Sequence, residues 1–173
     1  MIFAVLGSPL AAREFSFPAQ VEIAGQALER VGQSHFKWAW FSVYDGVLYL
    51  PAEVDPENVL ADVPKRLELL YFRGFPADRI AEAGDKKLRD NIDDATFTRL
   101  SEQVAQMNAL YVDLEEGDRY SLTYVPGQGT TLAHNGTDLG TVPGADFASA
   151  YFRIWLGDDP VGDRFRDELL GRR

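Results

Sequence analysis

The stretch from Phe36 to Leu50 most constrains this chain; it reads Phe-Lys-Trp-Ala-Trp-Phe-Ser-Val-Tyr-Asp-Gly-Val-Leu-Tyr-Leu and holds two of the three tryptophans. Aromatic and β-branched residues dominate it, and such residues favour a pleated, half-buried strand. Because successive side chains of a strand point to opposite faces, Trp38, Trp40 and Tyr44 share one largely aromatic face. We therefore predict the central strand of a sheet, with this face covered by helices.

Asp45 and Gly46 interrupt this stretch, and two interpretations of the pair remain open. Asp-Gly between alternating apolar runs is a strong signal for the tight turn of a β-hairpin. A glycine inside a long strand can instead mark a bulge that bends the strand. The residue pattern favours neither.

The composition indicates a single globular domain and narrows its chemistry. At 173 residues and 46% hydrophobic, the chain is long enough to bury a sizeable core. Its formal net charge of −10 argues against nucleic acid or an anionic membrane as a partner. The absence of cysteine excludes disulfides and thiol nucleophiles. His35 and His134 lie far apart without ligand spacing, so we expect no metal site, no cofactor and no histidine-based triad.

The first twelve residues, Met-Ile-Phe-Ala-Val-Leu-Gly-Ser-Pro-Leu-Ala-Ala, allow two interpretations. A short apolar run with a small-residue end resembles the back half of a secretory signal peptide, although the positively charged front is missing. This interpretation predicts a periplasmic or otherwise exported protein. The alternative is a short N-terminal strand in a cytoplasmic protein. No other stretch is long enough to span a membrane.

Along the rest of the chain, strands precede helices, then strands and helices follow again. Apolar residues at spacings of three and four, such as Phe97, Leu100 and Val104, predict a helix after Asp94. Asn135-Gly136 predicts the tip of a hairpin. Strands are predicted over 15–23, 27–31, 67–73, 119–125, 130–134 and 137–142, and helices from Pro76, from Asp94, over 145–156 and from Pro160. This segregation is typical of an α+β fold with a largely antiparallel sheet.

Three groups of residues, in this order, resemble the chalcone isomerase-like family, in particular its bacterial branch. They are Phe41-Ser42-Val43-Tyr44 with Leu48-Tyr49-Leu50, then Leu70-Tyr71-Phe72-Arg73-Gly74, and then Asn135-Gly136-Thr137-Asp138-Leu139-Gly140 with Ile154-Trp155-Leu156-Gly157. The resemblance implies an open-faced β-sandwich, a curved antiparallel sheet with helices packed on one face. It implies that residues 13–173 form one domain, and it favours a bend over a hairpin tip at Asp45-Gly46.

Members of this family are either isomerases that close a flavanone ring or relatives without that activity, some of which bind fatty acids. In the isomerases, an arginine ahead of the central strand, a threonine within it and a tyrosine near the next helices carry the reaction. The resemblance places Ala39 at the threonine and Pro76 near the tyrosine, and His35 to Lys37 where the arginine is expected. Ala39 and Pro76 offer no side-chain donor to stabilise developing charge. We therefore expect no catalytic residues of this kind.

The resemblance thus implies a non-catalytic protein that binds a small amphipathic ligand such as a fatty acid. Such a site needs an apolar lining and a polar anchor for a carboxylate. The predicted binding residues are Arg73, Lys37, Trp38, Trp40, Tyr44 and Tyr49. We predict Arg73 as the better anchor, because Lys37 alternates in direction with the tryptophans. The alternatives are an enzyme, an isomerase or lyase of another substrate, on the same scaffold, and a structural or protein-interaction role.

Overall fold

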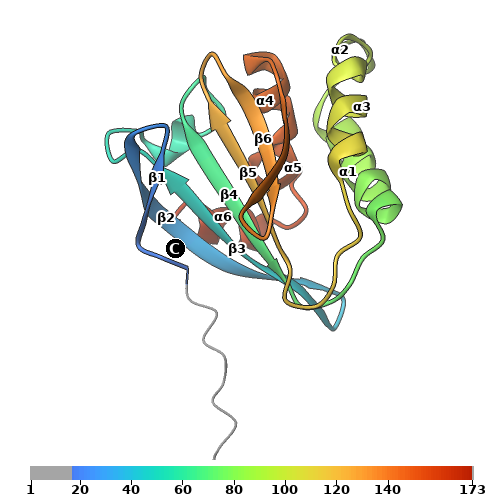
Figure 1. Cartoon of the computed structure of the whole chain (residues 1–173), viewed down its shortest axis with the longest axis horizontal. Helices are drawn as coiled ribbons and strands as arrows, with labels where there is room; N and C mark the ends of the chain where they lie inside the picture. The colour runs from blue at the N-terminus through green and yellow to red at the C-terminus, as the bar shows by residue number, and fades with distance from the viewer. Residues whose placement is uncertain (1–16, 173) are drawn as a thin grey trace, which may run out of the picture.

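The computed structural model describes residues 17–172, which form one antiparallel sheet covered by helices. Seven strands follow each other across the sheet in chain order, and Figure 1 shows the sheet strongly curved. The strands are β1 (Gln20–Ile23), β2 (Gln26–Trp38), β3 (Phe41–Leu50), β4 (Lys65–Tyr71), β5 (Arg119–Val125), β6 (Gly129–His134) and β7 (Thr137–Val142). Strands that neighbour each other in the sheet are also consecutive in the chain, although the connection from β4 to β5 runs over residues 72–118 and holds three helices.

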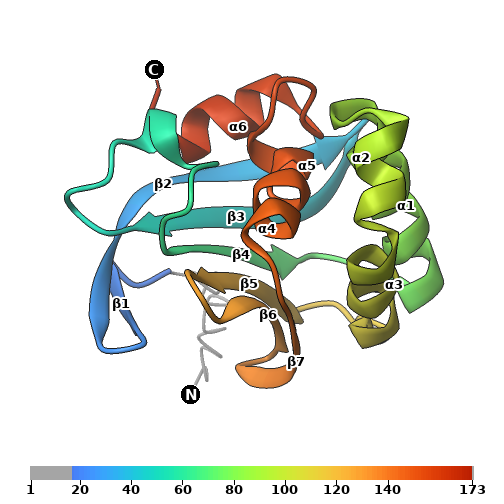
Figure 2. The same cartoon turned by 90° about the horizontal axis from the view of Figure 1, so that it is seen from above.

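The helices lie on one face of this sheet, as Figure 2 shows. There, α6 lies over β2, α4 and α5 lie over the middle of the sheet, and α1 to α3 stand together near the end of β2. The α-helices are α1 (Ala77–Asn91), α2 (Asp94–Arg99), α3 (Ser101–Leu110), α4 (Ala145–Tyr151), α5 (Arg153–Leu156) and α6 (Asp163–Leu169), and a short 3₁₀ helix spans Pro56–Asn58. The predicted α+β class, a curved antiparallel sheet with helices on one face, is confirmed.

The two faces of the sheet carry different cores, as strand alternation requires. Residues such as Leu48, Leu67 and Leu122 pack beneath the helices in the main core. On the outer face, Tyr49 and Leu70 belong to a smaller cluster that is covered by Phe17. One sheet therefore has a helix-covered face and a largely open outer face.

The predicted central strand is wrong in one respect: the stretch from Phe36 to Leu50 is the end of β2, a turn at Ala39 and Trp40, and β3. Trp38 and Trp40 lie at this hairpin tip, with 70% and 81% of their surface exposed, so the aromatic face is not buried there. The prediction failed because Trp-Ala-Trp contains none of the usual turn residues. Ala39 makes the turn with a φ of 52°, a left-handed conformation that is rare for alanine.

Gly46 lies within β3, so the interpretation of Asp45-Gly46 as a hairpin tip is wrong. Its pairing with Ser34 of β2 and Leu69 of β4 is unbroken. The two irregularities in this pair of strands lie elsewhere, one at Val31 between the Arg30 and Gly32 pairs and one between the Phe36–Tyr44 and Lys37–Ser42 pairs. A Cβ atom at position 46 would lie 2.5 Å from the ring of Phe165, so the glycine admits the α6 side chain into the sheet.

Several predicted helices begin or break at slightly different residues. Pro76 caps α1 rather than opening it, and the first free N–H, that of Ala77, donates to Asp113 at 2.8 Å. Asp93, not Asp94, caps α2 by accepting from the Thr96 N–H. The helix predicted after Asp94 is interrupted at Leu100, which separates α2 from α3.

The predicted signal-peptide remnant at residues 1–12 lies outside the described residues. Among residues 17–172, every helix is too short or too polar for a membrane crossing. In the same residues, no three histidine, aspartate or glutamate side chains gather closely enough to hold a metal ion.

Candidate ligand-binding site

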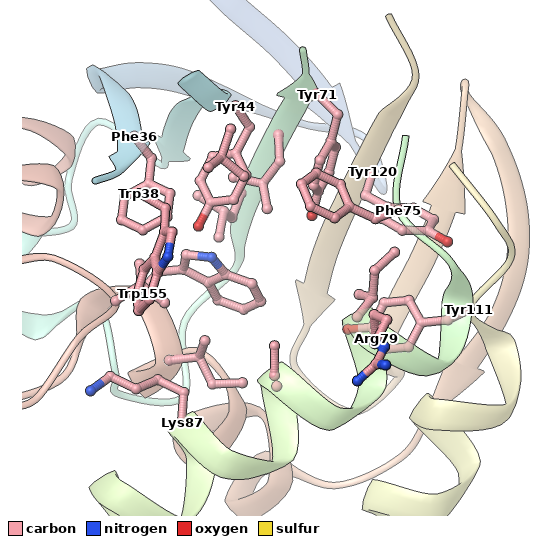
Figure 3. Close-up of a pocket in the computed structure, with 18 of the residues that line it drawn as sticks. Phe36, Trp38, Tyr44, Tyr71, Phe75, Arg79, Lys87, Tyr111, Tyr120 and Trp155 are labelled. Atoms are coloured by element: carbon pink, nitrogen blue, oxygen red, sulfur yellow. The ribbon is translucent and has the colours of Figure 1, made fainter. Parts of the chain in front are cut away.

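A cavity of about 640 Å³ lies between the sheet and the helices, at the end of the sheet where the β2–β3 hairpin turns. Its size falls within the range of roughly 300–1,000 Å³ that is typical of small-molecule sites. Strands β3, β4 and β5 form its floor, and α1 and α5 form its roof (Figure 3). Aromatic and aliphatic side chains dominate the lining, among them Phe36, Tyr44, Leu69, Phe75, Ile80 and Trp155.

Four tyrosines line this cavity, and three of them already have hydrogen-bond partners. Tyr44 bonds the Trp155 side chain, Tyr111 bonds Tyr151, and Tyr120 bonds the backbone of Val112 at 2.8 Å. For Tyr71, burial and the neighbouring tyrosines are the influences found among residues 17–172, and no hydrogen bond of its hydroxyl is found there. This hydroxyl is therefore available to a ligand.

Burial keeps these hydroxyls protonated. Removal from water raises the pKa of Tyr44 and of Tyr71 far above the usual value for a phenol. Burial also raises the pKa of Tyr111, and the neighbouring Tyr151 hydroxyl raises it further. At neutral pH the cavity therefore offers neutral hydroxyl donors and no phenolate base.

Positive charge lies at the rim of the cavity. The Arg79 side chain pairs with Glu82 at 3.0 Å, and Lys87 pairs with Asp159 at 2.9 Å. Arg73 stacks its guanidinium on the Phe41 ring at 4.3 Å. Neither Arg73 nor Lys86, the fourth rim cation, has a carboxylate partner within the part of the chain that the structure describes. Both remain free to attract an anionic group.

The structure brings three of the six predicted binding residues to this cavity: Trp38, Tyr44 and Arg73. Lys37 and Trp40 lie exposed on the hairpin and do not line it. Tyr49 lies on the outer face of the sheet, where its hydroxyl donates to the Pro18 carbonyl at 3.0 Å. For Tyr49 the reason is the pleat, because it is an odd number of residues from Tyr44 and so points to the opposite face.

The sequence reasoning missed Tyr71, Tyr111 and Trp155 as cavity residues. Tyr111 continues the spacing of three and four residues that Phe97, Leu100 and Val104 begin, and such spacing predicts core packing without showing that the helix leaves a cavity unfilled. Tyr71 stands two residues before Arg73 on the same strand face, and this spacing was a usable signal.

A second polar arrangement lies on the outer face and consists of Ser42, His35 and Asp45. His35 Nδ1 lies 2.6 Å from Asp45 Oδ1, and its Nε2 lies 2.9 Å from Ser42 Oγ. With the Nδ1 proton donated to Asp45, Nε2 accepts from the Ser42 hydroxyl, the connectivity of a Ser-His-Asp triad. The expectation that no histidine-based triad is possible is therefore wrong for the geometry.

The bulge in β3 explains why the sequence did not reveal this arrangement. Ser42 and Asp45 are three residues apart, so in a regular strand they would point to opposite faces. Val43 has no partner across from it, since Lys37 pairs with Ser42 and Phe36 pairs with Tyr44. This extra residue turns Ser42 to the face that carries His35 and Asp45.

A curved antiparallel sheet that encloses an apolar cavity beneath one layer of helices defines a class of small α+β protein with an internal cavity. The sequence matches the family described as chalcone isomerase-like over residues 11–171. The chain therefore belongs to the chalcone isomerase-like family.

The fold is similar to that of a solved fatty-acid binding protein from Arabidopsis thaliana. The TM-score is 0.70 at 16% sequence identity, and the similarity covers 91% of this chain and 92% of the plant protein. Among curated proteins, no sequence matches this chain.

Proposed function

We propose that this protein binds a small amphipathic ligand, a long-chain fatty acid, in the cavity between the sheet and the helices. The observation that carries the proposal is an apolar cavity with one unengaged hydroxyl, that of Tyr71, on its wall. An alkyl chain suits the lining, and a carboxylate accepts hydrogen bonds from Tyr71 and from a rim cation. The similarity in fold to a plant fatty-acid binding protein supports the same ligand class.

Arg73 is the rim cation that we assign to the carboxylate. It lies two residues beyond the end of β4, which Tyr71 closes, and its planar guanidinium can bind both carboxylate oxygens. The stack on Phe41 holds it over the rim without using its hydrogen-bond donors. Lys37 lacks this position, because it does not line the cavity.

Isothermal titration of palmitate into the wild type, Arg73→Ala and Lys37→Ala tests the assignment. A charge-assisted hydrogen bond contributes about 1.5–3 kcal/mol, and the exposure of Arg73 favours the lower end. We expect Arg73→Ala to weaken binding about tenfold and Lys37→Ala, the charge-matched control, to leave it unchanged. Absence of palmitate binding to the wild type would refute the proposed function, and a larger loss in Lys37→Ala would refute the anchor.

We expect no chalcone isomerase activity. Ala39 forms the exposed hairpin turn and Pro76 caps α1, and neither has a side-chain hydroxyl. The measurement is the absorbance of chalcone incubated with the pure protein. Enzyme-dependent turnover well above the spontaneous rate is the contrary outcome.

The outer-face arrangement favours a second candidate function, the hydrolysis of small esters. In that reaction Ser42 Oγ attacks the ester carbonyl while His35 Nε2 takes its proton, and the C–O bond to the alcohol breaks as that proton passes to the leaving oxygen. Water then hydrolyses the acyl-serine by the same proton path. The 2.9 Å and 2.6 Å contacts to the two ring nitrogens support this candidate.

A fluorophosphonate probe followed by peptide mass spectrometry tests this second candidate. We expect the label on Ser42 in the wild type, and none there in Ser42→Ala or His35→Ala. Ser34→Ala is the matched control, because that serine bonds Glu168 at 2.6 Å and has no histidine partner. If Ser42 is not labelled, the esterase candidate is refuted, and the role of the three residues is to stabilise the bulge of β3.

A further inference from the structure

The tip of the β2–β3 hairpin exposes an unusual amount of apolar surface. Trp38 is 70% exposed, Trp40 is 81% exposed and Phe41 is 38% exposed. Scattered single apolar residues are normal on a protein surface, but three adjacent large ones are not. Among residues 17–172, no other large hydrophobic side chain is exposed. We call residues 37–41 the aromatic tip.

The aromatic tip has a defined shape rather than a loose loop. Trp38 pairs with Phe41 across the turn, and Lys37 pairs with Ser42 behind it. The Trp40 and Phe41 rings contact each other with centroids 5.2 Å apart. Ala39 holds the left-handed conformation that turns the chain between two strands. The exposed rings are therefore presented on a paired β-ribbon.

This apolar surface is continuous with the mouth of the cavity. Trp38 and Phe41 belong both to the aromatic tip and to the cavity lining. Figure 3 shows Trp38 on one side of the cavity beside Trp155, with Arg79 and Tyr111 on the other side. A molecule that leaves the cavity at this end passes along the tip.

Cations without a carboxylate partner lie in the cavity lining and on the aromatic tip. Lys37, Arg73 and Lys86 have no carboxylate partner in the described part of the chain, and the latter two line the cavity. The net charge of −10 argues against an anionic surface as a partner. However, the Debye length is about 8 Å at physiological salt, so acidic groups on distant faces are screened. The electrostatic interaction with a docked surface is then set by the charges near the tip.

Indole rings with neighbouring cations match one kind of environment, the interface of a lipid bilayer. Tryptophan prefers the headgroup level, where its ring is apolar and its N–H stays hydrated. Lysine and arginine next to it meet the phosphates of anionic lipids. The position of the two tryptophans and the neighbouring cations beside a cavity for an amphipathic ligand favours a lipid surface as the partner.

We propose that the aromatic tip docks the protein on an anionic lipid bilayer, with Trp38, Trp40 and Phe41 inserted at the headgroup level. The cavity mouth then faces the bilayer, and an amphipathic ligand passes between the two without crossing bulk water. Docking itself does not depend on the proposed function, whereas the transfer of a ligand rests on it.

Vesicle binding tests the docking. The readouts are cosedimentation and tryptophan emission with vesicles of phosphatidylcholine containing phosphatidylglycerol, compared with phosphatidylcholine alone. Trp155, the third tryptophan, is only 8% exposed, so a blue shift in emission reports chiefly on the tip. We expect tighter binding to the anionic vesicles, and weaker binding as the salt concentration is raised.

Two double variants separate the apolar contribution to vesicle binding from the ionic contribution. Trp38→Ala with Trp40→Ala is expected to weaken binding by roughly tenfold or more, because most of the inserted ring surface is lost. Lys37→Ala with Lys86→Ala is expected to weaken it roughly fivefold for each cation removed. Arg99→Ala with Arg164→Ala is the matched control, since it removes two exposed charges from α2 and α6. This control should bind as the wild type does.

The outcomes distinguish docking from ligand binding. No binding of the wild type to either vesicle, or equal binding by the tryptophan variant, overturns the proposal. Self-association of the wild type in size-exclusion chromatography, abolished by the tryptophan variant and without vesicle binding, would assign the tip to a second copy and also overturn it. Palmitate titration without vesicles should give the same affinity for Trp40→Ala as for the wild type. Failure of that titration in the wild type would refute the proposed ligand and leave the docking result standing.

Discussion

The two ends of the sheet are stabilised in different ways. At the packed end, α6 lies so close to β2 that a Cβ atom on Gly32 would lie 2.1 Å from the Glu168 carbonyl oxygen. Also at this end, Lys65 is fully buried, with its ammonium group over the Tyr124 ring at 4.6 Å. At the other end, the cavity separates sheet from helix, and two tryptophans face solvent.

This contrast reverses the usual association between residue type and burial. The packed end depends on a glycine and a lysine, while the largest apolar side chains of the hairpin are exposed at its tip. At the packed end, close backbone contact at Gly32 leaves no room for a side chain at that position, whereas an open cavity leaves the tip without cover. Substitutions at the two ends should therefore differ in their effect on stability.

Gly32→Ala is expected to have the largest effect. The atoms that its methyl group would meet are the backbone oxygens of Glu168 and Leu169, at 2.1 Å and 2.6 Å, so α6 must shift as a whole. Overpacking of this kind costs about 3 kcal/mol. Urea unfolding followed by circular dichroism measures the loss.

Gly84→Ala is the matched control for that measurement. A Cβ atom at this position of α1 would meet only the Tyr151 hydroxyl, at 3.6 Å. Alanine favours a helix over glycine by roughly 0.5–1 kcal/mol, so we expect this variant to be more stable than the wild type. A Gly32→Ala variant as stable as the wild type would show that α6 is not tightly held against β2.

Lys65 should make the packed end more stable at alkaline pH. Burial lowers the pKa of Lys65 to about 8, an effect that the charge of Asp62 partly opposes. The unfolded chain keeps a pKa near 10.5 for this lysine. Between pH 8 and 10.5 the unfolded state therefore binds more protons, and the free energy of unfolding rises with pH. The gain from this one residue between pH 7 and 9.5 is about 2 kcal/mol.

Comparison with Lys65→Met isolates this gain, because the tyrosines titrate in both proteins. Urea unfolding at pH 7 and at pH 9.5 gives the two differences in free energy. We expect the free energy of unfolding of the wild type to rise relative to that of the variant as the pH rises. An unchanged difference would mean that the lysine is hydrated in the folded protein.

The sequence predicted those parts of this architecture that depend on local signals. β5 was predicted with its observed bounds, and the Asn135-Gly136 turn joins β6 to β7 as expected. The hairpin tip was missed, because Ala39 adopts its left-handed turn without glycine or asparagine. The break at Leu100 in the helix predicted after Asp94 was missed because the apolar spacing continues through the break.

The lining of the cavity was predictable only for residues on or next to the strands that the sequence singled out. Tyr44 lies on β3 and Arg73 just beyond the end of β4, within the stretches that the sequence singled out, and both line the cavity. Tyr111 and Trp155 come from segments more than thirty residues further along, and their approach depends on how the helices cross the sheet. Such a cavity arises from what helix packing leaves unfilled, and no local pattern records it.

Tyr49→Phe tests the packed end on its outer face, with a smaller expected effect. Its hydroxyl donates to the Pro18 carbonyl at 3.0 Å and ties the segment before β1 to the sheet. A hydrogen bond of this kind contributes about 1 kcal/mol. Tyr71→Phe is the control at the cavity end, because the Tyr71 hydroxyl has no partner in residues 17–172. Urea unfolding should show a loss only in the first variant, and equal losses would contradict the assignment.

Trp40→Ala should have the smallest effect on stability, although it removes the largest side chain. The sequence placed this residue on a buried face, where its loss would cost about 3–5 kcal/mol. At 81% exposure the indole contacts little besides the Phe41 ring, and exposed substitutions usually change stability by about 0.5 kcal/mol or less. Urea unfolding of Trp40→Ala beside Trp155→Ala, which removes a buried indole, gives the comparison. A loss above about 1 kcal/mol for Trp40→Ala would show that the tip is packed in solution, and the contrast between the two ends of the sheet would no longer hold.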